Sequence, residues 1–404
     1  MCSFSVSVAL DRSIGSGPAR FPLQVRAGAA SWGELTGIAR QLDAERFLLV
    51  SEPGVPAAHA DRALHHLGAA APTRMVRACD AIAFGADDIP PDAVIVALGG
   101  TSVLDAAVRP AAHTHRGPLL LPTTLPAVLD TALSLVGPAG PRRVPVLVRA
   151  QLEFLDTLAP NAVRPGLYAL VRNVLSVCPA AYDQVGARLR PDGRYDTGEL
   201  ASFIALCADV RAALTCYDPL EDGPAGVLRY GHAVADALRA LGVGALRYGD
   251  AVAQGLLVAA RCARRMGLLD AAGEAAHQEL LERWGAPGLL PAPVTARDVL
   301  RALRHAANGS GSEDHTVAMV LLDALGEPHV TAGRTVTPVG EDVLRAALGG
   351  AATDHVVAPP RRPGSGRETG RDTVGTGASC ARGTGRQNVV EDVSFRPRPG
   401  SRIL

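Results

Sequence analysis

The stretch AVIVALGGTSVLD, residues 93–105, carries the clearest structural signal in this sequence. An apolar run leads to the pair Gly99-Gly100, and a helical pattern follows from Ser102 to Val108. A short buried strand that turns at glycines into a helix is typical of a parallel α/β sheet. The backbone N–H groups of such a turn can bind a phosphate, although a glycine pair in this position is more often an ordinary turn.

Two further stretches repeat this strand-then-helix pattern. RFLLV (46–50) precedes the turn Ser51-Glu52-Pro53-Gly54 and a helical segment from His59 to Leu67. PLLLP (118–122) precedes Thr123-Thr124 and another helical stretch. Strands that alternate with helices predict a parallel sheet covered by helices, with ligands at the carboxyl ends of the strands. The two threonines could contribute hydroxyls to that edge or simply cap a helix.

The pattern changes after about residue 150. Apolar residues recur at three- and four-residue spacing in the stretches Leu167–Val177, Leu200–Leu214, Ala233–Leu241 and Ala251–Met266. This spacing predicts helices. We therefore expect an α/β fold with a Rossmann-like parallel-sheet domain over residues 1–150 and an all-helical domain over residues 151–350. Residues 351–404 are rich in Gly, Arg, Pro, Ser and Thr, so we expect a disordered tail.

The chain has 404 residues, with 40 basic and 40 acidic side chains. This balance argues against a nucleic acid or an anionic membrane surface as the main partner. No apolar run is long enough to span a membrane, and the first residues lack the basic and apolar regions of a signal peptide. The 7 cysteines are scattered without a CxxC pair, which is typical of a reduced, cytoplasmic compartment.

Lysine is absent, so all 40 basic residues are arginine. A GC-rich genome explains such a bias without any functional cause. The chemical consequence is the same in either case, because the chain cannot form a Schiff base or use lysine to carry protons.

Histidines provide the candidate metal ligands. His113 and His115 could bind a metal from one strand face, although surface histidines are the commoner explanation. His232 begins a helical stretch and Asp236 follows at i+4, so both side chains face the same side. This pair could share a cation or form an orienting hydrogen bond.

Several blocks of the sequence are similar to a known group of enzymes. These blocks are VALGGTSVLD (96–105), RGPLLLPTTLPAVLDTALSL (116–135), GLYALVRNVLSVCP (166–179), VLRYGHAVADAL (227–238) and RYGDAVAQGLLVAARCARRMGLLD (247–270). In this order they resemble the sugar-phosphate cyclases of the dehydroquinate synthase superfamily, and most closely the 2-deoxy-scyllo-inosose synthase branch. The likeness extends over about residues 20–348.

The resemblance implies an NAD-binding α/β domain, a helical domain that holds zinc or cobalt, and assembly as a homodimer. It also implies a reaction in which NAD transiently oxidises glucose 6-phosphate, phosphate leaves, and an aldol step closes a carbocycle. In this branch the product starts the 2-deoxystreptamine ring of aminoglycosides. The cofactor residues that the resemblance implies are Glu52, Gly99, Gly100, Thr101, Asp105, Thr123 and Thr124, and the catalytic residues are Asp130, Arg211 and His232.

The chain departs from the family at the metal site. The family holds its metal with one glutamate and two histidines, and two of these positions fall on Ala169 and Tyr248. His232 remains as the metal ligand that the resemblance implies, and Asp236 replaces the second histidine of the YGH…H pair. A zinc or cobalt site with one of three protein ligands cannot retain its ion at cellular concentrations.

The family's catalytic lysines and an acidic residue are replaced as well. Val136 and Arg172 stand at two lysine positions, and Arg211 and Asn308 lie near two others. Arg229 replaces a glutamate that would handle protons. Arginine can still bind phosphate, but it cannot exchange protons near neutral pH. Two loops of the family are also shortened in this chain. One surrounds the adenosine of NAD in the family, and the other follows the family's LSLK motif, which corresponds to LSLV (133–136) here.

These observations leave three hypotheses open. The first is an active cyclase of aminoglycoside or cyclitol biosynthesis with a weakened NAD site and a sugar phosphate as substrate. The second is a non-catalytic homologue that forms a heterodimer with an active cyclase or scaffolds another pathway enzyme. The third is an enzyme with altered chemistry that binds a metal through His232, Asp236 and Asp250. The residues favour loss or change of the original reaction over its retention.

Overall fold

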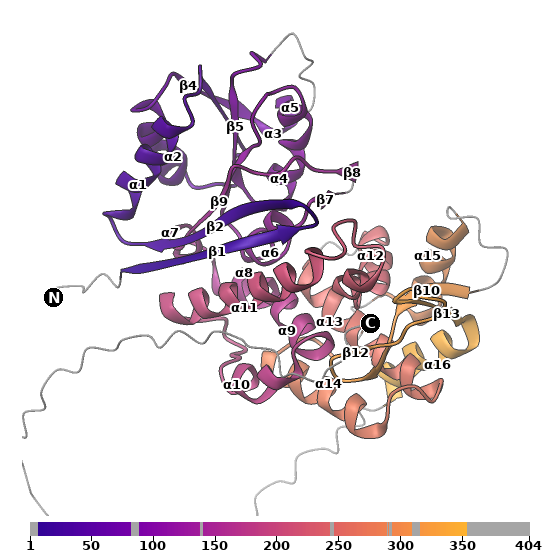
Figure 1. Ribbon diagram of the computed structural model, residues 1–404. Helices are drawn as coiled ribbons and strands as arrows, with labels where there is room; N and C mark the ends of the chain where they lie inside the picture. Colours follow the sequence, from indigo (N-terminus) through magenta and orange to yellow (C-terminus); the bar gives the residue numbers. More distant parts are fainter. Residues whose placement is uncertain are drawn as a thin grey trace, which may run out of the picture. The chain divides into compact units, whose positions relative to one another are not determined.

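A computed structural model describes residues 7–81, 89–137, 140–242, 246–288, 290, 293–308 and 316–353. The first half is built on a seven-stranded sheet with the strand order β1-β2-β9-β6-β5-β3-β4 (Figure 1). Its strands are β1 (Val8–Ser16), β2 (Ala19–Ala27), β3 (Phe47–Ser51), β4 (Thr73–Arg77), β5 (Val94–Gly99), β6 (Leu119–Pro122) and β9 (Leu147–Gln151). Strands β1 and β2 form an antiparallel hairpin, and the other neighbouring pairs are parallel.

The three strands expected from the sequence are β3, β5 and β6, and the parallel sheet is confirmed. Every residue of these strands is buried, which explains their continuous apolar runs. Strand β9 gives no such signal, because Arg149 and Gln151 interrupt its apolar pattern. Both side chains are buried and bond to each other, with Arg149 Nε donating to Gln151 Oε1 at 3.1 Å.

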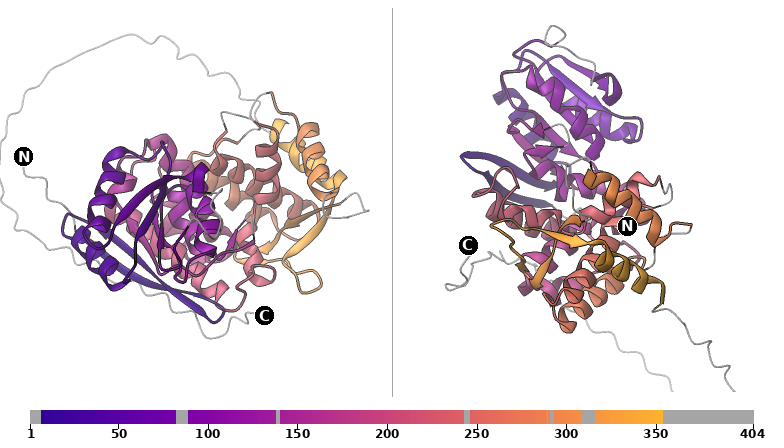
Figure 2. Two further views of the ribbon diagram at one scale, coloured as in Figure 1. Left: turned by 90° about the horizontal axis from the view of Figure 1, so that it is seen from above. Right: turned by 90° about the vertical axis from the view of Figure 1, so that its right-hand side faces the viewer.

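Helices cover both faces of the sheet (Figures 1 and 2). On one face, α1 (Ser31–Gln41) and α2 (Ala57–Gly68) share a core with β3 and β5. The other face contacts α4 (Thr101–Ala106), α5 (Val108–Ala112) and α6 (Leu125–Leu129). This second core continues into the helical half of the chain, so the two halves share one hydrophobic interior.

The second half is mainly helical, as predicted. Its α-helices are α7 (Glu153–Asp156), α8 (Pro160–Gly166), α9 (Tyr168–Ser176), α10 (Tyr182–Gly186), α11 (Thr197–Thr215), α12 (His232–Ala240), α13 (Tyr248–Arg265), α14 (Ala271–Trp284), α15 (Ala296–Asn308) and α16 (Glu341–Thr353). The second half also has the 3₁₀ turns η3 (Pro179–Ala181) and η4 (Pro224–Arg229), and the first half has the short elements α3 (Ala78–Ala81) and η2 (Thr131–Leu133).

The expectation of an all-helical second half needs a correction. Strand β10 (Thr316–Val320) pairs with β13 (Val336–Gly340), and β11 (Leu322–Ala324) pairs with β12 (Glu327–Pro328). The segments TVAMV and VTPVG are rich in valine and threonine, which favour strands over helices.

The predicted domain boundaries lie close to the ends of two elements in the structure. Strand β9 ends at Gln151, next to the expected boundary at residue 150. Helix α16 ends at Thr353, so residues 351–353 are helical although the sequence predicts disorder there. The rest of the predicted tail lies outside the described residues. Within the part of the chain that is described, no helix is both long and apolar enough to cross a membrane.

Helices α12 and α13 approach each other closely at two glycines. Gly231 precedes α12 with a φ of 82°, and a Cβ there would lie 3.0 Å from backbone atoms of Leu256 and Val252 on α13. A Cβ on Gly255 would meet the carbonyl oxygen of Gly231 at 1.9 Å. The glycine of the YGH block is therefore required for this contact, which places His232 against α13.

Gly231→Ala is expected to lower the free energy of unfolding more than Gly267→Ala. Both glycines have positive φ, so each alanine introduces backbone strain of about 1–2 kcal/mol. A Cβ on Gly267 meets no atom within 4 Å, whereas one on Gly231 is crowded by α13. We expect a further loss of about 2 kcal/mol for Gly231→Ala, measured by urea denaturation. Equal losses in the two variants would contradict the close contact of α12 with α13.

Candidate functional site

The carboxyl ends of β3, β5 and β6 bring most of the predicted cofactor residues together. Glu52 follows β3, Gly99 ends β5, and Thr123 and Thr124 follow β6. The Thr123 N–H donates to the Gly99 carbonyl at 2.9 Å. A Cβ on Gly100 would lie 3.4 Å from Thr124 Cγ2 and 3.9 Å from Glu52 Oε1, so these groups border one small space. The edge has the composition of a nucleotide site, with an acidic side chain beside a glycine turn.

Ser102 and Thr131, two hydroxyl residues that sequence reasoning missed, lie at the same edge as the predicted Thr101. Ser102 Oγ donates to Glu52 Oε2 at 3.3 Å, and Thr101 Oγ1 lies 3.1 Å from Thr131 Oγ1. Thr124 stands at the N-cap of α6, yet its side chain accepts no capping hydrogen bond, so its hydroxyl is not used by the helix end. A serine directly after a glycine turn is the signal that could have identified Ser102.

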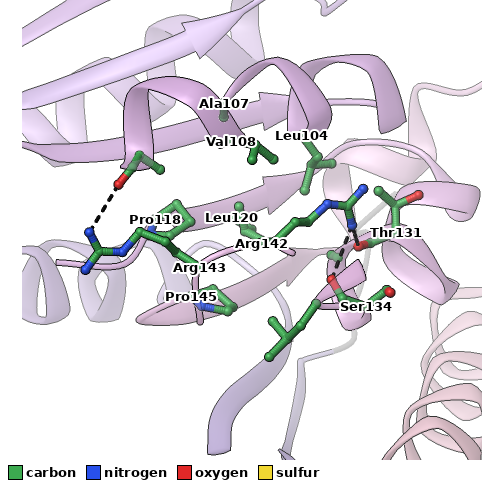
Figure 3. Close-up of a pocket in the computed structure, with 13 residues that line it drawn as sticks. Leu104, Ala107, Val108, Pro118, Leu120, Thr131, Ser134, Arg142, Arg143 and Pro145 are labelled. Atoms are coloured by element: carbon green, nitrogen blue, oxygen red, sulfur yellow. Dashed lines mark hydrogen bonds between the residues drawn. The ribbon is translucent and has the colours of Figure 1, made fainter. Parts of the chain in front are cut away.

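Asp105 differs from the other predicted cofactor residues because it forms an ion pair with Arg142. Arg142 also donates to the carbonyl oxygens of Thr131 (2.6 Å) and Ser134 (3.2 Å), as Figure 3 shows. Its side chain lines a small pocket together with apolar residues of α4, α5 and β6, among them Leu104. The Asp105 carboxylate thus helps to hold the guanidinium of Arg142 against the Thr131 and Ser134 carbonyls, and it is not a free ligand for a cofactor.

A cluster of charged side chains forms between α6, α9 and α11. Asp130, at the end of α6, accepts hydrogen bonds from Tyr168 Oη (2.8 Å) and Arg172 Nη1 (3.2 Å), both on α9. It also forms an ion pair with Arg211 on α11. The side chains of Arg172 and Arg211 are 1% and 3% exposed, so their charges depend on protein partners rather than water.

Asp130 remains ionised inside this cluster. Burial raises its pKa, but the positive charges of Arg172 and Arg211 outweigh burial and hold the pKa of Asp130 well below its ordinary value. Burial also raises the pKa of Tyr168, and the nearby Asp130 charge raises it further. The phenol therefore keeps its proton and donates a hydrogen bond to the carboxylate.

A second carboxylate balances the charge. Glu221, in the loop between α11 and η4, forms an ion pair with Arg211 and accepts a hydrogen bond from Ser134 Oγ at 2.7 Å. Asp130 and Glu221 are 13% and 12% exposed. Together with Arg172 the cluster holds two guanidinium groups and two carboxylates, so its net charge is zero. Sequence reasoning missed Glu221, because a single acidic loop residue gives no periodic or motif signal.

His232 begins α12, as predicted, and both of its ring nitrogens have neighbours. Nε2 lies 3.4 Å from Arg172 Nη1, and Nδ1 lies 3.3 Å from Tyr248 Oη. A guanidinium can only donate, so we assign Nε2 as the acceptor and place the proton on Nδ1. Tyr248 Oη in turn donates to Asp236 Oδ1 at 3.2 Å. A hydrogen-bonded chain therefore runs through Arg172, His232, Tyr248 and Asp236.

Aromatic rings pack around these hydrogen bonds. The ring centroids of Tyr168 and Tyr248 are 5.7 Å apart, and those of His232 lie 6.1 Å from Tyr168 and 5.9 Å from Tyr248. The rings meet edge to face, which is a favourable arrangement for aromatic side chains. Burial, and then the charge of Arg172, lowers the pKa of His232 to about 3, so its imidazole is neutral near neutral pH.

These contacts do not fit a divalent metal. Zinc and cobalt sites need several neutral or anionic ligands, whereas Nε2 of His232 faces a guanidinium and its Nδ1 is protonated. Asp250, which the third hypothesis adds, is ion-paired with Arg164 at 2.7 Å. No group of three His, Cys, Asp or Glu side chains among the described residues could hold a metal ion. His113 follows α5 and His115 lies in the next loop, so neither is on the expected strand face.

Comparisons with known proteins agree with this architecture. Residues 180–307 match the family model described as the 3-dehydroquinate synthase C-terminal domain. The 2-deoxy-scyllo-inosose synthase of Streptomyces kanamyceticus is 32% identical over 372 residues, which cover 84% of this chain and 92% of that protein. The 2-deoxy-scyllo-inosose synthase of Streptomyces lividus is 37% identical over 287 residues, which cover 66% of this chain and 74% of that protein.

Solved structures show the same fold. A crystal structure of 2-deoxy-scyllo-inosose synthase complexed with carbaglucose-6-phosphate, NAD+ and Co2+ has a TM-score of 0.73 at 24% identity, and the match covers 84% of this chain and 99% of that chain. A 2-epi-5-epi-valiolone synthase from Streptomyces hygroscopicus, with NAD+ and Zn2+ bound, has a TM-score of 0.60 at 18% identity, over 81% of this chain and 96% of that chain.

The fold and the sequence matches define the class. The chain belongs to the sugar-phosphate cyclases of the dehydroquinate synthase superfamily. Within that class, the two curated relatives described above, 32% and 37% identical to this chain, are 2-deoxy-scyllo-inosose synthases.

Asp130→Asn is expected to lower the free energy of unfolding by about 3–5 kcal/mol, because two buried guanidinium groups would lose a shared carboxylate. Asp105→Asn is the matched control, since Asp105 is 29% exposed and has one arginine partner. We expect a loss below about 2 kcal/mol for that control. Urea denaturation near neutral pH measures both values. Losses of similar size would mean that the Asp130 carboxylate contributes no more to stability than the partly exposed Asp105–Arg142 ion pair.

Acidification is expected to destabilise the protein through His232. An unfolded histidine has a pKa of about 6.5, whereas the folded value is about 3. Between these values the unfolded chain binds the proton more readily, so stability falls as the pH falls. The stability of His232→Gln should therefore change less than that of the unaltered chain between about pH 7 and about pH 5. Parallel pH profiles from thermal unfolding would contradict a neutral His232.

Proposed function

We propose that this chain is a cyclase homologue that has lost the metal-dependent ring closure and acts as a non-catalytic partner of an active sugar-phosphate cyclase. The main support is the hydrogen-bonded chain of Arg172, His232, Tyr248 and Asp236. It includes Tyr248, at a position where the family has a metal ligand, and it commits both nitrogens of the remaining histidine.

The charged cluster supports the same conclusion. Arg172 and Arg211 replace or lie near lysines of the family, and both could in principle bind a substrate phosphate. In this chain they are neutralised by Asp130 and Glu221. Arginine also cannot transfer protons near neutral pH, so Arg172 and Arg211 cannot take over proton transfer from the lysines that they replace or lie near.

The cofactor edge is better preserved, and we infer that it binds NAD with reduced affinity. Glu52 can accept hydrogen bonds from ribose hydroxyls, and the N–H groups of Gly100 and Thr101 can donate to a pyrophosphate. Thr123 and Thr124 border the same space. NAD supplies a hydride acceptor when bound, but here the chain's residues would only bind and orient it.

The retained core supports a role in association. Trp284 and Leu280 on α14 are fully buried, and Trp284 Nε1 donates to the Arg164 carbonyl at 2.8 Å. Packing of the helical half is thus intact while the ligands and lysines of the reaction are replaced. A subunit that works by binding another protein must keep its fold, but it need not keep its catalytic residues. We propose a heterodimer with an active cyclase of aminoglycoside or cyclitol biosynthesis, and a homodimer is the alternative assembly.

The test combines turnover with association. The purified chain, given glucose 6-phosphate, NAD and Co2+, is expected to release no phosphate above background, because no described side chains hold the metal. The Streptomyces lividus 2-deoxy-scyllo-inosose synthase, assayed in parallel, is the positive control. Calorimetry should still detect NAD binding, and Glu52→Ala should weaken it by about tenfold.

Association is tested by mixing the chain with that active enzyme, or with a cyclase encoded beside it. We expect co-elution in size-exclusion chromatography and a changed rate of phosphate release. Phosphate release by the chain alone would contradict the loss of catalysis and restore the active-cyclase hypothesis. Separate elution with an unchanged rate would contradict the role as a partner.

A further inference from the structure

The loop between α11 and η4 places a carboxylate inside the charged cluster. Glu221 has a φ of 56°, in the left-handed region that residues with a side chain rarely adopt. Its carboxylate is 12% exposed, forms an ion pair with Arg211 and accepts a hydrogen bond from Ser134 Oγ at 2.7 Å. An unfavourable backbone conformation persists only where the surroundings hold it. Here the holding contacts are those of the carboxylate and the hydrogen bond that the Glu221 N–H donates to the Asp218 carbonyl at 3.3 Å.

Part of this loop faces solvent. Tyr217 and Leu220 are 88% and 59% exposed. Asp218 anchors the loop at its other side by accepting a hydrogen bond from the Gly223 N–H at 2.9 Å. The loop is therefore a surface segment with two inward carboxylates: Asp218 bonds to the loop's own backbone, and Glu221 lies between Arg211 and Ser134.

Charge counting shows what Glu221 does for the cluster. Arg172 and Arg211 carry two positive charges, and Asp130 carries one negative charge. Without Glu221 the cluster would hold a net positive charge in a largely buried place. Arg211 Nη1 would then lose its acceptor, and Ser134 Oγ would keep only the Val136 carbonyl, at 3.0 Å, as an acceptor on the same side. Converging donors around a buried positive charge are the chemistry that binds phosphate or sulfate.

We propose that Glu221 is a built-in competitor that occupies a latent site for a phosphate-type anion formed by Arg211 and Ser134. The anion binds when the carboxylate leaves, and the loop between α11 and η4 then moves outward. This inference goes beyond the proposed function. It assigns the blocking of the anion site to the Glu221 side chain, and it does not depend on whether the chain has lost catalysis.

Inorganic phosphate is the probe, titrated by calorimetry into the full chain and into Glu221→Gln. Glutamine keeps the size of the side chain and removes its charge. We expect Glu221→Gln to bind phosphate about tenfold more tightly than the unaltered chain. Asp222→Asn is the matched control, because Asp222 is an exposed neighbour and its change alters the net charge equally. Equal gains in the two variants, or no gain in Glu221→Gln, would overturn the proposal.

Glu221→Gly provides an independent variant, since glycine adopts a positive φ without strain and removes the carboxylate. It should bind phosphate at least as tightly as Glu221→Gln. Adding Ser134→Ala to either variant should weaken phosphate binding by about tenfold, because one donor is lost. Phosphate binding that is indifferent to Ser134→Ala would place the anion elsewhere and refute the proposal. Neither result bears on turnover or on association with an active cyclase, so the two proposals fail separately.

Discussion

The ion pairs of Asp130 with Arg172 and Arg211 connect the end of α6 to α9 and α11, and the site takes its form from them. Three buried charges in such a place are stable only as a set, because any one of them alone would lose its hydration without compensation. Glu221 and Tyr168 complete the set with a second carboxylate and a phenol donor. The result is a neutral and internally satisfied cluster.

This arrangement has a direct chemical consequence. A cyclase site must hold a cation, accept a phosphate and exchange protons, so its charged groups have to remain available to substrate. Here the guanidinium groups are paired within the protein, and His232 lies between Arg172 and Tyr248. A cluster that satisfies itself stabilises the fold, and this internal pairing is the basis of the loss of catalysis that we propose. Membership of a cyclase family and the proposed loss of cyclase chemistry are therefore compatible in this chain.

The sequence predicted the elements that carry unambiguous local signals. Strands β3, β5 and β6 are buried on both faces, so their apolar runs could be recognised without a structure. The start of α12 at His232 follows from the glycine before it, which adopts a φ of 82°. Strand β9 escaped detection because buried Arg149 bonds to Gln151 and Gln24 and so resembles a surface residue in the sequence. Glu221 was missed for a related reason, because the sequence does not show that the carboxylate of this loop residue is largely buried.

The sequence alone established which chemical groups the chain possesses: arginine but no lysine, a glycine pair after an apolar run, and alanine and tyrosine at two positions where the family resemblance implies metal ligands. Those are properties of single residues, and they need no fold to be read. The partners of the arginines are different, because Arg172 meets Asp130 across 42 residues and Arg211 meets it across 81. Such pairings arise only when distant helices pack together, so it was the folded chain that revealed two potential phosphate ligands as a neutral, closed cluster.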